Sequence, residues 1–185
     1  SVLVGGPAGL GKSHLAETVL SLFPKEDIIT NSRITPAGLM GMEDLSSKIL
    51  YIYERFHDAQ FAQYIRELMS EGEVVYTTAN GVQRLQGPVT LIEITVNLDT
   101  LGTENRSRCF VVSINSSDGA KAGICEKVKA ARTVQGLMTE ESKKGLLETH
   151  RLFQQGLDSS VQVVIPYAKE IRFKASPYHA PRIIQ

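Results

Sequence analysis

The chain has 185 residues, of which 42% are hydrophobic and 22% charged, the ordinary balance of a soluble globular domain. Twenty basic residues balance twenty acidic ones, which excludes a wholly basic nucleic-acid module but leaves room for a local basic site. No apolar run approaches the length of a membrane span. The two cysteines, Cys109 and Cys125, stand in no metal-ligand spacing, and two reduced thiols favour a cytoplasmic protein.

The most informative motif lies at the start of the chain. The segment from Gly6 to Ser13 reads Gly-Pro-Ala-Gly-Leu-Gly-Lys-Ser, which fits the phosphate-loop pattern of a glycine, four residues and then Gly-Lys-Ser. Its glycines allow successive backbone N–H groups to turn toward phosphate oxygens, and a helix beginning near Gly11 adds its positive end. In this pattern Lys12 reaches the β- and γ-phosphates, and the Ser13 hydroxyl is a ligand of Mg²⁺.

The residues on either side of this loop agree with the motif. A short buried strand is predicted at 2–4, and Leu15, Val19 and Leu22 mark one face of a helix from about Gly11 to Phe23. A glycine-rich turn that binds nothing is the alternative, which these flanks disfavour. We therefore predict that ATP and Mg²⁺ bind here, in contact with Gly6, Pro7, Ala8, Gly9, Leu10, Gly11, Lys12, Ser13 and His14.

Strands and helices alternate along the rest of the first half. Strands are predicted at 27–30, 48–54, 88–95 and 109–114, and a helix at about 57–70. This order predicts an α/β fold with a parallel sheet covered by helices, as in P-loop NTPases. Asn80-Gly81 between two β-prone runs, 73–78 and 82–86, predicts a β-hairpin inserted into that plan.

The second half is expected to be mainly helical. From Gly119 the pattern is helical to about Leu157, with breaks predicted near Gly136 and Gly145, and a β-prone run follows at 161–165. We predict an ATPase core at 1–118 and a helical and β extension at 119–185, and we expect that extension to be truncated.

Glu54 is a candidate for both catalysis and metal binding. It follows an apolar strand, at the edge of a parallel sheet where ligands bind. Hydrolysis of a nucleoside triphosphate needs a group that orients water and an acid near Mg²⁺. Many such enzymes carry two adjacent acids here, whereas this chain has Tyr53 in the first position. A surface acid that happens to end a strand is the alternative.

Two arginines precede the last core strand, in Asn105-Arg106-Ser107-Arg108. Arginine binds phosphate in a planar, bidentate way and keeps its charge, and a neighbouring subunit can supply one to the γ-phosphate. Two solvated loop arginines fit the spacing equally well.

Taken together, these motifs resemble AAA+ ATPases of the branch that includes the minichromosome-maintenance helicases. The resemblance is carried by the phosphate loop, the strand at 49–54, the hairpin insertion and Ser107-Arg108-Cys109-Phe110. The segments at 86–93, 104–109 and 163–167 are similar to the helicase domains of primase-helicases from phages and integrated mobile elements, and the likeness covers most of 1–175. It implies a five-stranded parallel sheet of the AAA+ type and a hexameric ring.

The resemblance also implies roles for single residues. Arg108 corresponds to the arginine finger, and Thr95, or less well Asn97, to the sensor of the γ-phosphate. The hairpin, with Asn80 at its tip and Arg84 on its second strand, would touch DNA; a structural or subunit-contact hairpin is the alternative.

The predicted function is therefore the ATPase domain of a DNA replication helicase that couples ATP hydrolysis to translocation on single- or double-stranded DNA. An AAA+ protein remodeller or nucleotide-gated assembly module is the first alternative. A P-loop phosphotransferase is less favoured, because a phosphotransferase lid usually carries several arginines and the stretch after Gly119 has few that are well placed.

Overall fold

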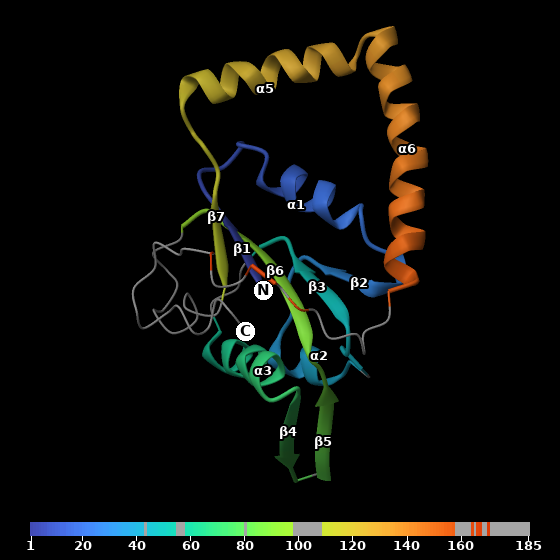
Figure 1. Cartoon of the computed structure of the whole chain (residues 1–185). Helices are drawn as coiled ribbons and strands as arrows, with labels where there is room; N and C mark the ends of the chain where they lie inside the picture. The colour runs from blue at the N-terminus through green and yellow to red at the C-terminus, as the bar shows by residue number, and fades with distance from the viewer. Residues whose placement is uncertain are drawn as a thin grey trace. The chain divides into compact units, whose positions relative to one another are not determined.

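The computed structural model describes residues 1–42, 44–54, 58–79, 81–97 and 109–157, together with 164, 166, 167 and 170. The chain divides into two compact units, Ser1–Gln155 and Gly156–Gln185, and all the elements named here belong to the first (Figure 1). They are β1 (Val2–Gly5), α1 (Lys12–Leu20), the 3₁₀ helix η1 (Lys25–Asp27), β2 (Ile28–Asn31), α2 (Pro36–Met40), β3 (Lys48–Ile52), α3 (Ala59–Ser70), β4 (Glu73–Thr78), β5 (Gly81–Gln86), β6 (Val89–Thr95), β7 (Phe110–Ser113), α5 (Asp118–Ala131) and α6 (Val134–Gln155).

The main sheet is parallel and has five strands in the order β2-β3-β6-β1-β7. This confirms the predicted five-stranded parallel sheet. β1 lies between β6 and β7, with Gly5 opposite Thr95 on one side and Ser113 on the other. The carboxyl ends of the strands therefore meet at one edge, directly where the segment after β1 begins.

The two faces of the sheet carry separate apolar cores. Side chains alternate along β3, so that Leu50 and Ile52 join the core beneath α2 and α3, whereas Ile49 and Tyr51 join the core beneath α1. The α1 side also receives Ala16 and Leu20 from the helix. Because both faces of β3 are covered by an apolar core, consecutive residues of this strand must be apolar, as the sequence of β3 shows.

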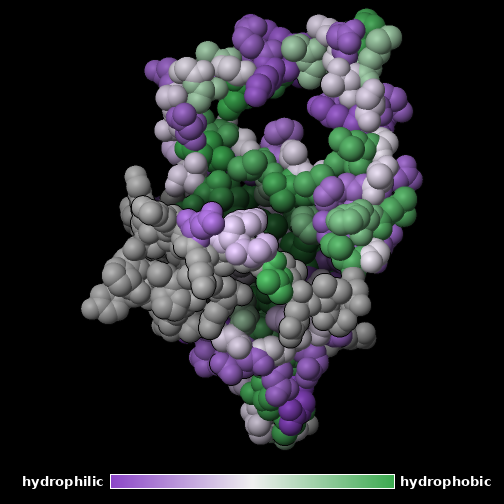
Figure 2. Space-filling view, in the orientation of Figure 1, coloured by the Kyte–Doolittle hydropathy of each residue, from purple (hydrophilic) through white to green (hydrophobic). Residues whose placement is uncertain are grey.

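The predicted hairpin is formed by β4 and β5, which pair antiparallel. At its base Val74 and Leu85 face each other and are buried. Further out, the ring of Tyr76 meets the edge of Tyr64 on α3, with 5.8 Å between ring centroids. The face of the hairpin that points away from α3 carries both polar residues and exposed valines. Figure 2 shows hydrophilic and hydrophobic side chains mixed on the hairpin. Asn80 lies outside the described residues.

Helical structure follows β7, as predicted, and between Asp118 and Gln155 it has one break, close to the break predicted near Gly136; the break predicted near Gly145 is wrong. The chain turns at Arg132–Thr133, where the Thr133 Oγ1 accepts a hydrogen bond from the Gly136 N–H at 3.1 Å. A Cβ at position 136 would overlap the carbonyl oxygen of Ala130, so this glycine permits a close approach of α6 to the end of α5. Gly145 lies within α6, where an exposed glycine weakens a helix without ending it.

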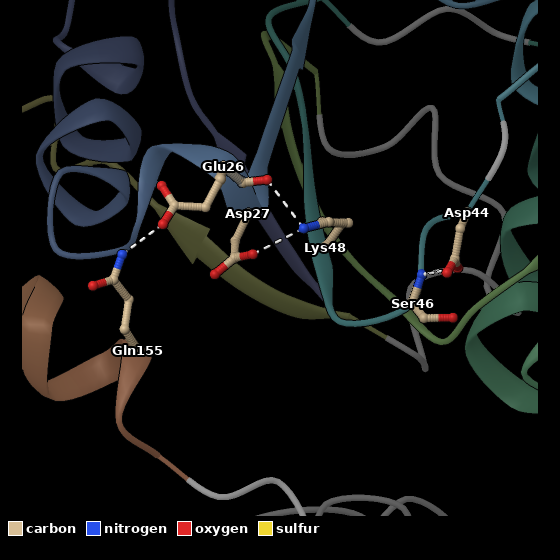
Figure 3. Close-up of polar contacts among 6 residues, drawn as sticks. All are labelled: Glu26, Asp27, Asp44, Ser46, Lys48 and Gln155. Atoms are coloured by element: carbon tan, nitrogen blue, oxygen red, sulfur yellow. Dashed lines mark hydrogen bonds and ion pairs between the residues drawn. The ribbon is translucent and has the colours of Figure 1, made fainter.

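The last turns of α6 are attached to the segment after α1. His150 Nδ1 lies 3.0 Å from the Leu22 carbonyl oxygen, and Arg151 Nε donates to the Ser21 carbonyl oxygen at 2.8 Å. Gln155 Nε2 donates to a carboxylate oxygen of Glu26 at 2.5 Å. Figure 3 shows that contact beside the ion pair between Lys48 on β3 and Asp27, at 2.9 Å.

α5 and α6 bury none of their residues and expose several large apolar side chains. Those on α6 include Leu137, Met138, Leu146 and Phe153. Figure 2 shows hydrophobic side chains on the surface of this part of the molecule. Within the described part of the chain, no helix combines the length and apolar character that crossing a membrane requires.

We expect the core beneath α2 and α3 to dominate stability. Leu50 on β3 is 0% exposed, so Leu50→Ala should lower the free energy of unfolding by about 2–5 kcal/mol through lost burial and a residual cavity. Leu152→Ala on α6 is the matched control, because that leucine is 64% exposed and its loss should change stability by less than about 0.5 kcal/mol. Urea unfolding followed by circular dichroism measures both; equal effects would contradict this assignment of the core.

Candidate functional site

The loop after β1 wraps around the first turn of α1. Gly6, Gly9 and Gly11 have φ values of 148°, 77° and 79°, a region that side chains other than glycine rarely adopt. A Cβ at Gly9 or Gly11 would meet nothing within 4 Å, so it is the backbone conformation and not a lack of space that calls for glycine there. The Gly6 N–H donates to the Thr95 carbonyl oxygen at 3.3 Å, which fixes the loop to the end of β6.

Lys12 is a buried cation at the first position of α1. Its side chain is 7% exposed, and its Nζ donates to the carbonyl oxygen of Pro7 at 2.6 Å. An ammonium group has three hydrogens to donate, and burying a charge is costly unless it is paired. Among the described residues Lys12 has no acidic partner. The loop therefore holds a cation whose remaining donors suit an anionic ligand.

Tyr51 lies beneath the same turn, on the side of β3 that faces α1. Its side chain is 1% exposed, and its hydroxyl makes no hydrogen bond. Burial, with smaller contributions from the nearby Glu17 and Tyr53, raises the pKa of Tyr51 to about 12, although the Ser13 side chain lies close enough to act in the opposite direction. The geometry of a Ser13–Tyr51 hydrogen bond is not met here, so the phenol remains a buried, neutral and unpartnered group beside Ser13.

Glu54 and Thr95 lie at the same edge of the sheet as the loop. Glu54 comes two residues after the end of β3 and is exposed. Thr95 ends β6 next to Gly5, and its hydroxyl donates to the Asn97 carbonyl oxygen at 3.0 Å and accepts from the Asn97 N–H at 3.2 Å. Between them, Tyr53 is 42% exposed and meets the ring of Tyr51 at a centroid distance of 4.7 Å.

The structure thus brings the segment from Gly6 to His14, Glu54 and Thr95 to the same edge of the sheet; the roles predicted for them stay predictions. Arg108 lies outside the described residues, as does Asn80. Arg84 is not part of this edge, because β5 leads into the amino end of β6 and the hairpin projects from the opposite end of the sheet (Figure 1). It pairs instead with Glu73 across the hairpin, at 3.4 Å.

Sequence reasoning missed Tyr51, which was assigned only to a buried strand. Because side chains alternate along a strand, the sequence could have placed Tyr51 and Tyr53 on the same face of β3. In the structure that face is directed toward α1. Among the described residues, no group of three or more His, Cys, Asp or Glu side chains could hold a metal ion. Mg²⁺ bound with nucleotide does not require such a group, because it uses one or two protein oxygens together with phosphates and water.

The buried phenol makes stability depend on pH in the alkaline range. Native Tyr51 keeps its proton up to about pH 12, whereas the unfolded chain loses it near the ordinary pKa of 10.0, so the free energy of unfolding falls as pH rises between these values. Tyr51→Phe should abolish this loss, and its stability relative to wild type should rise by about 1.4 kcal/mol per pH unit above 10. Urea unfolding from pH 8 to 11 measures the difference; parallel profiles would contradict it.

Comparison with known proteins identifies the fold. No protein-family model matches the chain, and no curated protein matches its sequence. Two similar solved structures are those of NtrX from Brucella abortus in complex with ADP and with ATP, with TM-scores of 0.52 and 0.51, each at 18% sequence identity over 69% of this chain. The chain spans 34% of the length of either NtrX chain. At this identity the likeness shows the fold alone, a parallel α/β sheet flanked by helices.

Proposed function

We propose that this chain binds ATP with Mg²⁺ and hydrolyses it. The observation that carries the proposal is the buried Lys12 at the start of α1, surrounded by a loop whose glycines take the left-handed conformations of a phosphate cradle. The proposal is supported by the shared fold of NtrX, which was crystallised with ADP and with ATP.

The residues at this edge fit a nucleotide and its cation. Lys12 neutralises charge on the β- and γ-phosphates, and the N–H groups of the loop bind phosphate oxygens. The Ser13 hydroxyl is the protein ligand of Mg²⁺, which when bound screens the phosphate charge. Glu54 orients the attacking water, and it is the acidic side chain at the carboxyl end of β3. Thr95 senses the γ-phosphate, and Arg108 of one subunit completes the site of its neighbour.

The finer proposal is that the chain is the motor domain of a DNA replication helicase of the phage or mobile-element type, working as a hexameric ring in the cytoplasm. Its support is the order of the motifs and the hairpin inserted before β6. In this proposal the hairpin contacts DNA through Asn80 and Arg84, and ATP hydrolysis moves the ring along the strand. The division into a core at 1–118 and an extension at 119–185 belongs to the same proposal.

One observation favours a protein-remodelling or assembly ATPase as the second candidate. Arg84 is paired with Glu73, so the hairpin offers little free positive charge to a phosphate backbone. The same surface exposes Val75 and Val82, at 46% and 59%, which suit contact with a protein. Both candidates use the same nucleotide chemistry and differ in what the hairpin touches.

ATP hydrolysis with and without single-stranded DNA tests the proposal. We expect Lys12→Ala to lower the rate by about 100-fold or more, because it removes the cation that stabilises charge on the transferred phosphoryl group. Lys25→Ala in η1 is the matched control, since that lysine is exposed and should leave the rate unchanged. Hydrolysis that does not need Lys12 would contradict the site.

The DNA arm of the same assay separates the two candidates. Stimulation by single-stranded DNA that is lost in Arg84→Ala, but kept in Arg132→Ala, supports the helicase. Arg132 is an exposed arginine at the end of α5 and serves as the control. Lys12-dependent hydrolysis that ignores DNA favours the remodelling or assembly ATPase.

Mixing two inactive variants tests whether Arg108 acts in a neighbouring site. Glu54→Gln should stop hydrolysis in its own site, and Arg108→Ala should stop it in the site of the neighbour. A mixed ring contains some interfaces with both residues intact, so mixing should restore a measurable fraction of the activity. Absence of rescue over a range of mixing ratios, with both variants assembling normally, would count against a role in the neighbouring subunit.

A further inference from the structure

The hydroxyl of Tyr51 has no function in the core that surrounds it. The ring packs with Ile49, Ala16 and Leu20 beneath α1, which a phenylalanine would do equally well. The hydroxyl is fully buried and unpartnered, and leaving a buried polar group without a hydrogen bond costs about 1–3 kcal/mol. A buried orphan of this kind calls for an explanation outside packing.

The position of the hydroxyl points to the metal ligand. Tyr51 and Tyr53 lie on the same side of β3, toward α1, and their rings meet edge to face. Ser13 lies in the first turn of α1, one turn before Ala16, which packs in the same core as Tyr51. The acid that many related sites carry at position 53 is replaced by a ring, so no carboxylate at that position can accept the hydroxyl proton of Ser13.

We propose that the Tyr51 hydroxyl is the hydrogen-bond partner of Ser13 when the site holds nucleotide and Mg²⁺. In that arrangement Ser13 donates its hydroxyl proton to the Tyr51 oxygen, which leaves an oxygen lone pair of Ser13 directed at the cation. Tyr51 is thus a positioning residue that acts through Ser13. It is a neutral acceptor for the Ser13 hydroxyl proton, in place of the acid that many related sites carry at position 53. This inference rests on the proposed nucleotide-binding function of the loop.

A neutral partner has a definite consequence for the site. A phenol orients Ser13 without adding negative charge of its own to the attraction for Mg²⁺. The contribution of Tyr51 therefore concerns the cation and leaves the binding of metal-free nucleotide to Lys12 and the loop. Measuring the Mg²⁺ requirement separately from the binding of metal-free nucleotide therefore distinguishes this role of Tyr51 from a purely structural one.

The test is a titration of Mg²⁺ in the binding of a fluorescent ATP analogue to the 185-residue chain. Tyr51→Phe should raise the Mg²⁺ concentration at half-maximal binding by about two- to tenfold, the range of one net hydrogen bond. Affinity for the analogue in EDTA should stay unchanged. Tyr64→Phe is the control, because Tyr64 is also buried but belongs to the core on the other face of the sheet, where its hydroxyl accepts a hydrogen bond from Gln60 Nε2 at 2.8 Å.

Two further variants connect the effect to Ser13. In a Ser13→Ala background Tyr51→Phe should have no additional effect, because the group through which it acts is gone. Tyr53→Asp should restore a low Mg²⁺ requirement to Tyr51→Phe by supplying a carboxylate at the neighbouring position. A change that persists without Ser13, or that Tyr53→Asp does not reverse, would overturn the inference.

The controls distinguish this inference from the function on which it depends. If wild type binds the analogue and Lys12→Ala does not, while Tyr51→Phe keeps the wild-type Mg²⁺ requirement, the inference fails alone. It fails likewise if Tyr51→Phe weakens binding equally in Mg²⁺ and in EDTA. If wild type shows no Lys12-dependent binding, the proposed function fails and the inference falls with it.

Discussion

The parallel pairing of β1 between β6 and β7 is the constraint on which the rest of this structure depends. It places the end of β1 in the interior of the sheet, between two other strands. The chain must therefore leave the carboxyl edge of the sheet, reverse direction and return as helix α1 across one face of the sheet. Gly6, Gly9 and Gly11 make that reversal possible through backbone angles that other residues rarely adopt. The hydrogen bond from Gly6 to the end of β6 then ties the loop to the neighbouring strand.

The same geometry brings charge into a buried place. Lys12 begins α1 and is carried below the surface, where its partner among the described residues is a carbonyl oxygen of its own loop. Beneath it Tyr51 brings a buried hydroxyl that has no hydrogen-bond partner. Buried polar groups left in this way oppose folding, and they cluster at sites that exist to bind something. The unpartnered hydroxyl of Tyr51 lies on the α1 side of the sheet, whereas the core beneath α2 and α3 is built mainly from apolar side chains.

The hairpin and the two last helices are built differently from this edge. The hairpin is held at its base by Val74 and Leu85 and carries its charged residues in a pair, Glu73 with Arg84. α6 is joined to the core by hydrogen bonds from His150, Arg151 and Gln155 to the segment after α1. The phosphate loop and the hairpin therefore lie at opposite ends of the sheet (Figure 1).

The sequence by itself determined the phosphate loop, the alternation of strands and helices, the parallel sheet and the hairpin. These follow from local causes: glycines at fixed spacing, apolar periods, and Asn-Gly between β-prone runs. The sequence predicts the break between α5 and α6 near Gly136 but not its position at Arg132–Thr133, because Gly136 is required by its contact with Ala130 and does not end a helix. The sequence also left open whether the charge of Arg84 is available to a ligand, because its ion pair with Glu73 depends on the register in which β4 and β5 pair. Only the tertiary structure decided that Tyr51 lies unpartnered beside Ser13, because that neighbourhood is created by packing α1 against β3, between residues far apart in the chain.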